Sequence, residues 1–368
     1  MKIISHSKDY CVEFKEVFSA EEITPSGNYL VVIDRVVHGL NKDGMFDKLN
    51  ENNLLLFDAV EGNKTIESAL VICKKMADLG IRRSDTIVSI GGGIVQDVTG
   101  FAANIYNRGI KWIYVPTTLL AQCDSCIGGK TSINYLAHKN ILGTFYAPDT
   151  IYIHLDFVKT LSEDDYLSGL GEVAKFNIMS AKDGIELLEK NVGRLLQRDI
   201  QTLDFFVRRS LAFKKVFIEE DEYDYGKRNL LNFAHTFGHA FEMVSEYAIS
   251  HGQAITLGLI VANNISRTRN ILDPSLKERV EKICLNFISI KLDEKWCAAE
   301  NIINAMKKDK KRRTEKLAAV LFASDLSLKV VQDIEPLEVD GALRNLIKIL
   351  SNAGKICGGK PHERVVHL

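Results

Sequence analysis

Short, almost wholly apolar runs recur through the first 160 residues of the chain. Their sequences are YLVVID, NLLLF, TIVSI, WIYV and TIYI, at Tyr29–Asp34, Asn53–Phe57, Thr86–Ile90, Trp112–Val115 and Thr150–Ile153. Runs of this kind are typical of strands that are buried on both faces of a parallel sheet. Between residues 65 and 79 the apolar positions recur every three or four residues instead, which indicates a helix. The alternation predicts an α/β domain with crossover connections over residues 1–160.

The pattern changes after residue 160, where strand-like runs nearly vanish. Helical spacing dominates five long stretches, at Glu163–Met179, Ile185–Leu196, Thr202–Glu219, Leu230–Glu246 and Gly252–Arg267. We therefore expect a mostly α-helical second domain over residues 161–355. Residues 356–368 are expected to be a tail, poorly ordered from Gly358 onward.

Composition excludes several classes of function. The 368 residues carry a net charge of -1, so there is no electrostatic case for nucleic acid or an anionic membrane. No apolar run reaches the roughly 18 residues that span a bilayer, and residues 1–13 lack a signal-peptide core. The seven scattered cysteines form no disulfide framework, which favours a reducing, cytosolic compartment. Cys123 and Cys126 have CxxC spacing, but a zinc ribbon needs a second pair, so we expect them to be packing residues.

A glycine run follows one of the predicted strands. Gly91-Gly92-Gly93 separates the strand Thr86–Ile90 from a helix-like stretch, Val95–Ile105. A glycine turn that opens a helix can cradle a phosphate, because the backbone N–H groups and the helix dipole favour an anion. The run is not the GxGxxG fingerprint, so a simple tight turn is the alternative. Asp97, one turn into the helix, would by itself be an ordinary first-turn acid.

A polar segment rich in glycine lies between two predicted strands. It runs from Asp124 to Asn134 and is followed by Lys139 and Asn140. Loops at strand ends of an α/β domain usually carry binding groups. Lys130 and Lys139 suit a phosphate, although both could be solvated surface lysines.

Histidines and a carboxylate in the second domain suggest a metal site. His235 and His239 are four residues apart on a predicted helix, and His251 comes sixteen residues after His235. Glu172 lies in the first predicted helix of this domain. The spacing pairs His235 with His239, but two ordinary helix histidines would show it too. These residues alone do not decide which of the three histidines would bind a metal.

Arg228 and Asn232 precede His235 on the same predicted helix face. A planar guanidinium suits a substrate carboxylate, since it can donate two parallel hydrogen bonds. The alternative is a surface arginine near Asp221 and Glu222.

Taken together, four motifs resemble those of the 3-dehydroquinate synthase family. They are GGGIVQD, VPTTLLAQ with the GGKT that follows it, GEVAK and NFAHTFGH, at 91–97, 115–131, 171–175 and 232–239. The resemblance extends from about residue 60 to 265. It implies a Rossmann-like, NAD-binding α/β domain followed by a helical metal-binding domain, and a cytoplasmic homodimer.

The resemblance also implies an activity. Enzymes of this family close a seven-carbon keto-acid sugar phosphate, 3-deoxy-arabino-heptulosonate 7-phosphate, into 3-dehydroquinate with loss of phosphate. NAD is reduced and then reoxidised on the enzyme, so there is no net redox change. Zn²⁺ or Co²⁺ would be held by Glu172, His235 and His251, which replaces the local pairing of His235 with His239.

Each remaining site residue takes its expected role from the same resemblance. Asp124 and Lys175 would partner the reacting hydroxyls. The phosphate would be met by Lys130, Asn140, His239 and, across a dimer, Arg108. The carboxylate and hydroxyl end would be met by Lys214, Arg228, Asn232 and Lys311. NAD would be held by Glu61, Lys64, Gly92, Gly93, Asp97, Thr117, Thr118 and Lys139.

Two departures from the family pattern affect these expectations. Gln96 stands where glycine is usual, so the approach to the pyrophosphate could differ. Gln253 stands where glutamate is usual, which would weaken support for the metal ligands.

Three other functions compete with this reading. A related cyclase could make an amino-dehydroquinate or another cyclitol, but relatives that use substrates without a carboxylate change the residues corresponding to Lys214, Arg228 and Asn232. A metal-dependent polyol dehydrogenase would produce NADH and would not need the phosphate cluster around Lys130. An inactive binding protein is disfavoured, because the set of metal ligands looks complete.

Overall fold

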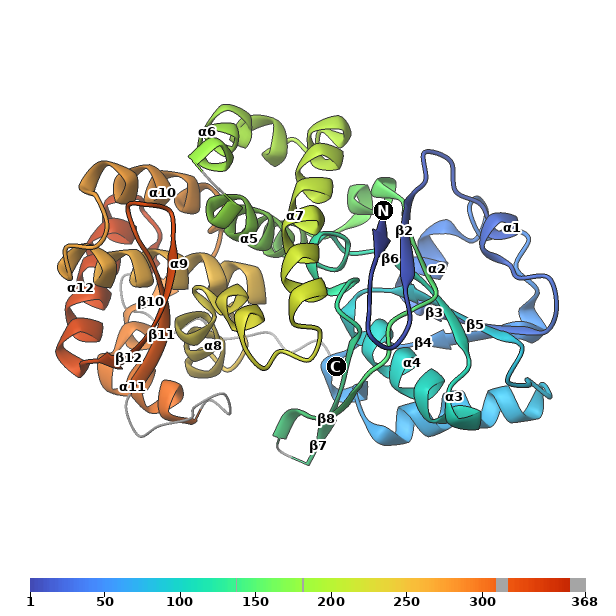
Figure 1. Cartoon of the computed structure of the whole chain (residues 1–368). Helices are drawn as coiled ribbons and strands as arrows, with labels where there is room; N and C mark the ends of the chain where they lie inside the picture. The colour runs from blue at the N-terminus through green and yellow to red at the C-terminus, as the bar shows by residue number, and fades with distance from the viewer. Residues whose placement is uncertain (137, 181, 309–316, 358–368) are drawn as a thin grey trace. The chain divides into compact units, whose positions relative to one another are not determined.

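The computed structural model describes residues 1–136, 138–180, 182–308 and 317–357, which form two compact units. The first unit comprises Met1–Gly169 and Arg194–Arg228, and the second comprises Leu170–Gly193 and the described residues from Asn229 onward (Figure 1). This division differs from a single boundary after residue 160. The difference arises because a long helix, α7 (Ile200–Glu220), packs against elements of the first unit.

In the part of the chain that the structure describes, the first unit is built on a seven-stranded sheet. The strand order is β1-β2-β9-β6-β5-β3-β4, with bounds Lys2–Ile3, Tyr10–Phe14, Thr150–Ile153, Lys111–Pro116, Thr86–Gly91, Tyr29–Asp34 and Leu54–Phe57. Only β1 pairs antiparallel. The five apolar runs are therefore all strands of one parallel sheet, as predicted. The first two strands of this order, β1 and β2, were missed; β2 alternates buried and exposed residues.

Helices cover this sheet, and a hairpin extends from the unit. The helices are α1 (Ala20–Ile23), α2 (Arg35–Asn41), α3 (Ile66–Asp78) and α4 (Gly93–Ile105), with short 3₁₀ turns η1 (Glu51–Asn53), η2 (Glu61–Asn63), η3 (Tyr106–Arg108) and η5 (Leu155–Thr160). A π-helical turn, η4 (Ala121–Ser125), packs against α7. The segment expected to be a polar loop instead forms the antiparallel hairpin β7 (Lys130–Tyr135) and β8 (His138–Phe145). Figure 1 shows this hairpin projecting from the unit.

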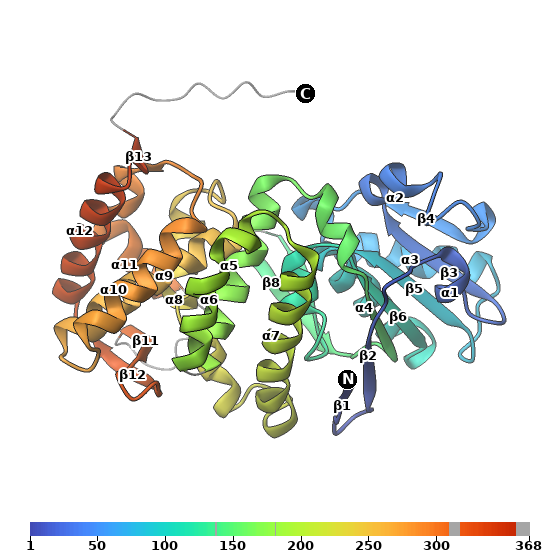
Figure 2. The same ribbon diagram turned by 90° about the horizontal axis from the view of Figure 1, so that it is seen from above.

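The second unit is mostly helical, as predicted. Its elements are most of α5 (Glu163–Ser180), then α6 (Lys182–Leu196), η6 (Lys227–Asn232), α8 (His235–Val244), α9 (His251–Thr268), α10 (Pro274–Asn286), η7 (Glu294–Cys297), α11 (Ala299–Lys308) and α12 (Pro336–Asn352) (Figure 2). Helix α9 is the centre of the unit, since every residue from Gly252 to Ser266 is buried. It packs against α8, α10 and α12.

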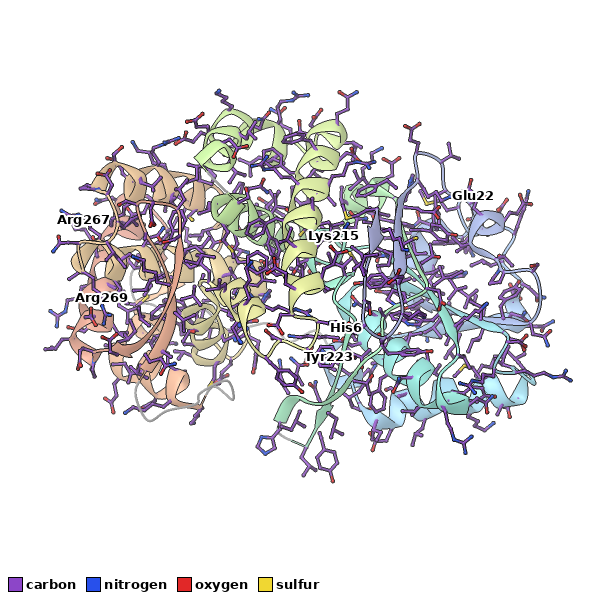
Figure 3. All side chains as sticks on the ribbon, in the orientation of Figure 1. His6, Glu22, Lys215, Tyr223, Arg267 and Arg269 are labelled. Carbon is purple, nitrogen blue, oxygen red and sulfur yellow. The ribbon has the colours of Figure 1, made fainter. Side chains whose placement is uncertain are left out.

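The second unit also has short strands, which the sequence pattern did not predict individually. An antiparallel hairpin joins β11 (Leu317–Phe322) to β12 (Leu328–Ile334), and β10 (Leu292–Asp293) pairs with β13 (Ile356–Cys357). Arg269, labelled in Figure 3, ties the end of α9 to this region by bonds to Asp333 and Glu338 of 2.6–2.7 Å. The expected tail from Gly358 lies outside the described residues. None of the helices described has both the length and the apolar character needed to cross a membrane.

Candidate active site

Three helices of the second unit bring a carboxylate and two imidazoles together. Glu172 comes from α5, His235 opens α8 and His251 opens α9. The Nε2 atoms of His235 and His251 lie 3.5 and 3.3 Å from Oε1 of Glu172. One ligand atom from each of the three residues lies within 4.8 Å of the others. The arrangement is the one that the resemblance implied.

Glycines allow these helices to approach so closely. A Cβ on Gly171 would lie 2.1 Å from the carbonyl oxygen of Gly252, between α5 and α9. A Cβ on Gly258 would lie 2.4 Å from the carbonyl oxygen of Ala234, between α9 and the start of α8. Any side chain at either position would push apart the helices that carry the three groups, because packed interiors have no room to absorb a methyl group there.

The electrostatics of Glu172 suit a cation. Its side chain is fully buried, and neither carboxylate oxygen accepts a hydrogen bond of good geometry from a described residue. Lys175 Nζ lies 2.5 Å from Oε2 as an ion-pair partner. Burial lowers the pKa of His251, but the neighbouring carboxylates of Glu172 and Glu242 outweigh it and raise that pKa to about 10. One oxygen and two nitrogen ligands are a common set for Zn²⁺ and suit Co²⁺, so these residues fit such an ion.

Glu242 is a site residue that the sequence reading missed. Its two carboxylate oxygens lie 3.3 and 3.4 Å from His251 Nδ1, and His235 Nδ1 lies 3.2 Å from the carbonyl oxygen of Phe233. Both contacts engage Nδ1 and leave Nε2 facing Glu172, which is how outer contacts usually orient metal-binding imidazoles. The available signal was spacing, since Glu242 follows His239 by three residues and shares its helix face.

His239 lies in the same cluster. Its ring centroid is 5.3 Å from that of His235 and 5.9 Å from that of His251. With Glu242 and His251 it forms a second group whose ligand atoms lie within 4.8 Å of one another. His235 and His239, which the i, i+4 spacing paired, therefore do lie close together. The two histidines that contact the buried carboxylate, however, are His235 and His251.

Gln253 does not play the part that its position suggested. Its Oε1 accepts hydrogen bonds from the backbone N–H groups of Ser289 and Ile290 at 2.8 and 3.2 Å, and its Nε2 donates to Ser250 Oγ at 3.2 Å. These bonds anchor the start of α9 to the segment after α10. Glu242, rather than Gln253, contacts His251 Nδ1, and the effect of Gln253 on the metal ligands stays a prediction.

In the first unit, the glycine run forms the expected strand–turn–helix. Gly91 ends β5, Gly92 caps α4 and Gly93 begins it. A Cβ on Gly91 would be 2.5 Å from Cγ2 of Val95, and one on Gly92 would be 2.9 Å from Cγ2 of Thr118. The tight turn leaves the N-terminal N–H groups of α4 without side-chain caps, which suits a phosphate.

A polar network surrounds Asp97 of α4. Its Oδ2 lies 2.5 Å from Lys64 Nζ and 2.7 Å from Ser132 Oγ, and Lys64 Nζ also donates to Asn140 Oδ1 at 2.7 Å. Burial raises the pKa of Asp97 and outweighs the opposing effects of Lys64 and Ser132. Ser132 was not predicted. Asn140, expected at the substrate phosphate, belongs to this network.

The network continues to the other expected nucleotide contacts. Asn134 Nδ2 donates to Glu61 Oε1 at 2.8 Å, and Lys139 Nζ lies 3.8 Å from the same oxygen. Thr117 is buried with its N–H bonded to the carbonyl oxygen of Gly91, while Thr118 Oγ1 accepts from the N–H of Ala121. Most of the residues expected to bind the dinucleotide thus share one end of the sheet.

Asp124 lies on the π-helical turn η4, which side chains fix from two sides. Lys214 Nζ contacts both the carbonyl oxygen and Oδ1 of Asp124 at 2.7 Å. Gln96 Nε2 donates to the carbonyl oxygen of Ser125 while Ser125 Oγ donates to Gln96 Oε1, both at 2.8 Å. Gln96, which stands where the family usually has glycine, therefore joins helix α4 to the segment that carries Asp124. π-Helical turns of this kind are frequent at functional sites.

The expected helix presenting Arg228, Asn232 and His235 on one face does not exist. Arg228 and Asn232 lie in the 3₁₀ turn η6, and Ala234 has φ +69° before α8 begins at His235. The left-handed residue breaks the helical register, which periodicity alone could not show. Arg228 is buried and donates to the backbone carbonyls of Gly128 and Glu222.

The remaining predicted residues occupy separate places. Lys130 begins β7 and pairs with Asp224, and Arg108 is exposed at a turn with φ +60°. Lys311 lies outside the described residues. The buried thiols of Cys123 and Cys126 lie within reach of backbone carbonyls, Cys126 3.6 Å from that of Gln122, as expected for packing residues.

The first unit is an α/β fold with a glycine loop at a helix N-terminus. The second is a helical fold with a buried Glu–His–His cluster. Together they define a class of two-unit proteins that have a nucleotide site and a metal site. The chain belongs to the 3-dehydroquinate synthase family. The family's N-terminal model matches residues 54–168 and its C-terminal model matches residues 169–312. The family expected from the four motifs is confirmed.

Individual relatives agree with this assignment. The chain is 34% identical over 315 residues to the 3-dehydroquinate synthase of Dictyoglomus thermophilum, covering 85% of this chain and 88% of that protein. It is 37% identical over 270 residues to that of Clostridium tetani, covering 73% and 72%.

Solved structures show the same fold. ValA, the 2-epi-5-epi-valiolone synthase of Streptomyces hygroscopicus with NAD⁺ and Zn²⁺ bound, has a TM-score of 0.82 at 24% identity, covering 95% and 98% of the two chains. A 2-deoxy-scyllo-inosose synthase complexed with carbaglucose-6-phosphate, NAD⁺ and Co²⁺ has a TM-score of 0.80 at 23% identity, covering 94% and 99%. The predicted fold class is therefore confirmed.

Proposed function

We propose that the protein is a 3-dehydroquinate synthase, which converts 3-deoxy-arabino-heptulosonate 7-phosphate into 3-dehydroquinate and orthophosphate. The observation that carries the proposal is the buried carboxylate of Glu172, which faces two imidazoles in a chain of this family. The reaction would be a phosphorus–oxygen lyase reaction that depends on NAD and on Zn²⁺ or Co²⁺. When bound, NAD would take up and return one hydride, and the metal would polarise substrate oxygens.

The residues of the second unit would hold the metal and order its surroundings. Glu172, His235 and His251 would bind it, while Glu242 would fix the ring of His251 through Nδ1. Lys175 Nζ, buried beside Glu172, would donate a hydrogen bond to a reacting hydroxyl oxygen. Its positive charge also stabilises the buried carboxylate, because an unpaired charge in an apolar interior is costly.

The residues of the first unit would bind the dinucleotide and the phosphate. Gly92 and Gly93 present backbone N–H groups to the pyrophosphate, and the Asp97 network would meet the nucleotide. Asp124 would accept a hydrogen bond from a reacting hydroxyl, and Lys214, whose Nζ lies 2.7 Å from its Oδ1, would hold it in place. Lys130 would pair with the departing phosphate. No side chain is assigned as general base, since the substrate phosphate can itself accept the proton.

Substrate choice within the family is the finer part of the proposal. Lys214 and Arg228 are both buried in the first unit, where they could meet a substrate carboxylate. Two of the five N–H groups of Arg228 reach backbone carbonyls, so a carboxylate would use the others. The relatives that match by sequence are named 3-dehydroquinate synthases at 33–37% identity, which favours the acid substrate over a neutral heptose phosphate.

Phosphate release separates the proposal from its alternatives. The purified protein with NAD and Zn²⁺ or Co²⁺ should release phosphate from the seven-carbon keto-acid phosphate, and a chelator should abolish release. Faster release from a heptose phosphate that lacks the carboxylate would indicate a cyclitol synthase. Oxidation of a polyol without phosphate release would indicate a dehydrogenase, a class that includes more distant structural neighbours such as a probable glycerol dehydrogenase of Sinorhizobium meliloti, with a TM-score of 0.55.

We also propose that the protein is a homodimer in which Arg108 contacts the phosphate bound by the partner subunit. The support is the resemblance together with the exposed position of Arg108. Light scattering gives the mass in solution. An Arg108→Ala variant mixed with an inactive metal-ligand variant should regain activity if the site is shared.

A further inference from the structure

Lys130 meets a carboxylate that neither the resemblance nor the sequence pattern pointed to. Its Nζ lies 2.5 Å from Oδ2 of Asp224, in the loop between α7 and η6. The Lys130 side chain is 46% exposed, whereas that of Asp224 is 14% exposed. The other oxygen of Asp224, Oδ1, is buried with no hydrogen-bond partner among the described residues. Its Oδ2 contacts the ammonium expected to bind a phosphate, and the guanidinium of Arg228 is a second positive charge that interacts with this carboxylate.

The two segments that carry this pair are held in fixed positions. Arg228 bridges them, because it donates to the carbonyl of Gly128 on one side and to that of Glu222 on the other. Gly128 also donates its N–H to Tyr10 Oη at 2.9 Å. It has φ +106°, and a Cβ there would lie 2.2 Å from Nη2 of Arg228. The turn before Lys130 therefore has one well-defined conformation.

The loop that carries Asp224 is braced as well. Asp221 accepts backbone N–H groups of Tyr225, Gly226 and Arg228 at 2.8–3.0 Å. The N–H of His6 donates to Glu222 Oε2 at 2.6 Å, and the rings of His6 and Tyr223 stack, with centroids 6.4 Å apart (Figure 3). Asp224 itself has φ +61°, a left-handed conformation held by these neighbours. Its contact with Lys130 is therefore part of a built arrangement.

We propose that Asp224 is an internal competitor for the phosphate-binding ammonium of Lys130. The proposal rests on the proposed function, which assigns Lys130 to the phosphate. A phosphate dianion that binds Lys130 must either displace Asp224 or share the ammonium with it, and two anions at one cation repel each other. Asp224 thus lowers the affinity for phosphate groups. The orthophosphate product, which lacks the rest of the substrate's contacts, is affected most.

Inorganic phosphate is the probe for this competition. Calorimetric titration of the full chain at constant ionic strength should show tighter phosphate binding for Asp224→Asn, which removes the charge and keeps the shape. We expect a gain of about two- to fivefold, the range for loss of one exposed charge pair. Asp224→Glu, which keeps the charge, should bind as the unaltered protein does. Asp204→Asn, on α7 and paired with Arg208, controls for the change in net charge and should also have no effect.

A double-mutant cycle with Lys130→Ala locates the effect. The gain from Asp224→Asn should vanish when Lys130 is alanine, because there is then no ammonium to compete for. Unchanged or weaker phosphate binding by Asp224→Asn, with binding still lost in Lys130→Ala, would overturn the competition and leave the proposed function standing. Normal phosphate binding by Lys130→Ala would overturn the assignment of Lys130, and this proposal with it.

Discussion

At the scale of the residue, Glu172 is a fully buried carboxylate in a cluster of charged and polar side chains. A charged carboxylate in a dry interior costs several kcal/mol unless it is paired and hydrogen-bonded. Lys175 supplies one charge, and the two imidazoles face the carboxylate without donating well-formed hydrogen bonds to it. The carboxylate and the two imidazoles therefore place one oxygen and two nitrogens where a cation could bind.

Replacing Glu172 with glutamine tests whether this carboxylate binds the metal. Zn²⁺ affinity of Glu172→Gln should fall by at least about 100-fold, since loss of an outer-shell partner alone costs 10- to 100-fold. The metal-free variant should be less stable than the unaltered protein, because the buried ammonium of Lys175 loses its ion-pair partner. Competition with a chromogenic chelator measures the first effect, and thermal unfolding with and without Zn²⁺ measures the second. A metal-induced rise in Tm that survives the substitution would rule out Glu172 as a ligand.

Arg228 makes a second prediction, because its guanidinium joins two backbone segments. Arg228→Lys keeps the charge but cannot donate in a planar fork. We expect the free energy of unfolding to fall by about 1–3 kcal/mol from the carbonyls left unpaired in the interior. The kcat/KM for the seven-carbon acid should fall as well, while metal binding remains. Urea unfolding and kinetics together check it. An unchanged unfolding curve with impaired kinetics would mean that Arg228 acts on substrate alone.

The cysteines give a prediction on pH. Burial raises the pKa of both Cys126 and Cys297 to about 12, so these thiols remain protonated, and unreactive, throughout the range from pH 7 to 10. The exposed Cys11 should react with a thiol reagent at pH 8, because the reagent can reach its sulfur. Peptide mapping after timed labelling distinguishes them. Labelling of Cys126 in the native protein at pH 8 would contradict the structure.

At the scale of the element, the site depends on how α8 and α9 meet. The left-handed Ala234 lies between η6 and α8 and lets α8 begin at His235, and its carbonyl lies where a side chain on Gly258 would be. Sequence periodicity joined these segments into one helix, since apolar spacing does not reveal a single residue with positive φ. The β7–β8 hairpin was also overlooked, because its strands carry polar residues. These residues form one side of the Asp97 network.

Gly258→Ala tests this contact between helices. The added methyl would lie 2.4 Å from a backbone oxygen, so α8 and α9 must separate, at about 1–3 kcal/mol or more of overpacking. Zn²⁺ affinity should fall with stability, because His235 and His251 begin the two helices. Gly341→Ala in α12 is the matched control, since its Cβ would meet nothing within 4 Å. That change should stabilise the protein by about 0.5–1 kcal/mol. Equal effects of the two substitutions on unfolding would refute the packing argument.

At the scale of the whole molecule, the two units carry different parts of the proposed chemistry. The α/β unit holds the glycine loop, the Asp97 network and Lys130, and the helical unit holds the Glu172 cluster. The site residues of one unit alone cannot explain a reaction that releases phosphate without a net redox change. The proposed activity therefore requires the intact chain.

The redox balance is the prediction that belongs to this scale. NAD should be needed only in catalytic amount, at a ratio to enzyme near one, and absorbance of NADH should not accumulate while phosphate is released. The physical reason is that the hydride taken up in the first step returns to the same substrate. Simultaneous measurement of NADH and phosphate checks it. One NADH formed per turnover would place the protein among the dehydrogenases.

The sequence by itself determined the elements whose signals are local. Buried parallel strands are apolar throughout and helices repeat at 3.6 residues, so the five central strands and most helices could be predicted. The four motifs determined the family. Tertiary structure alone decided the partners, because these depend on which distant elements pack together. It brought His251 against Glu172, as the resemblance implied and the local spacing did not, placed Glu242 beside His251 and Asp224 beside Lys130, and turned Arg228 toward two carbonyls. It also assigned α7 to the first unit. Each contact joins residues whose separation in sequence carries no periodic signal, so only the folded chain reveals it.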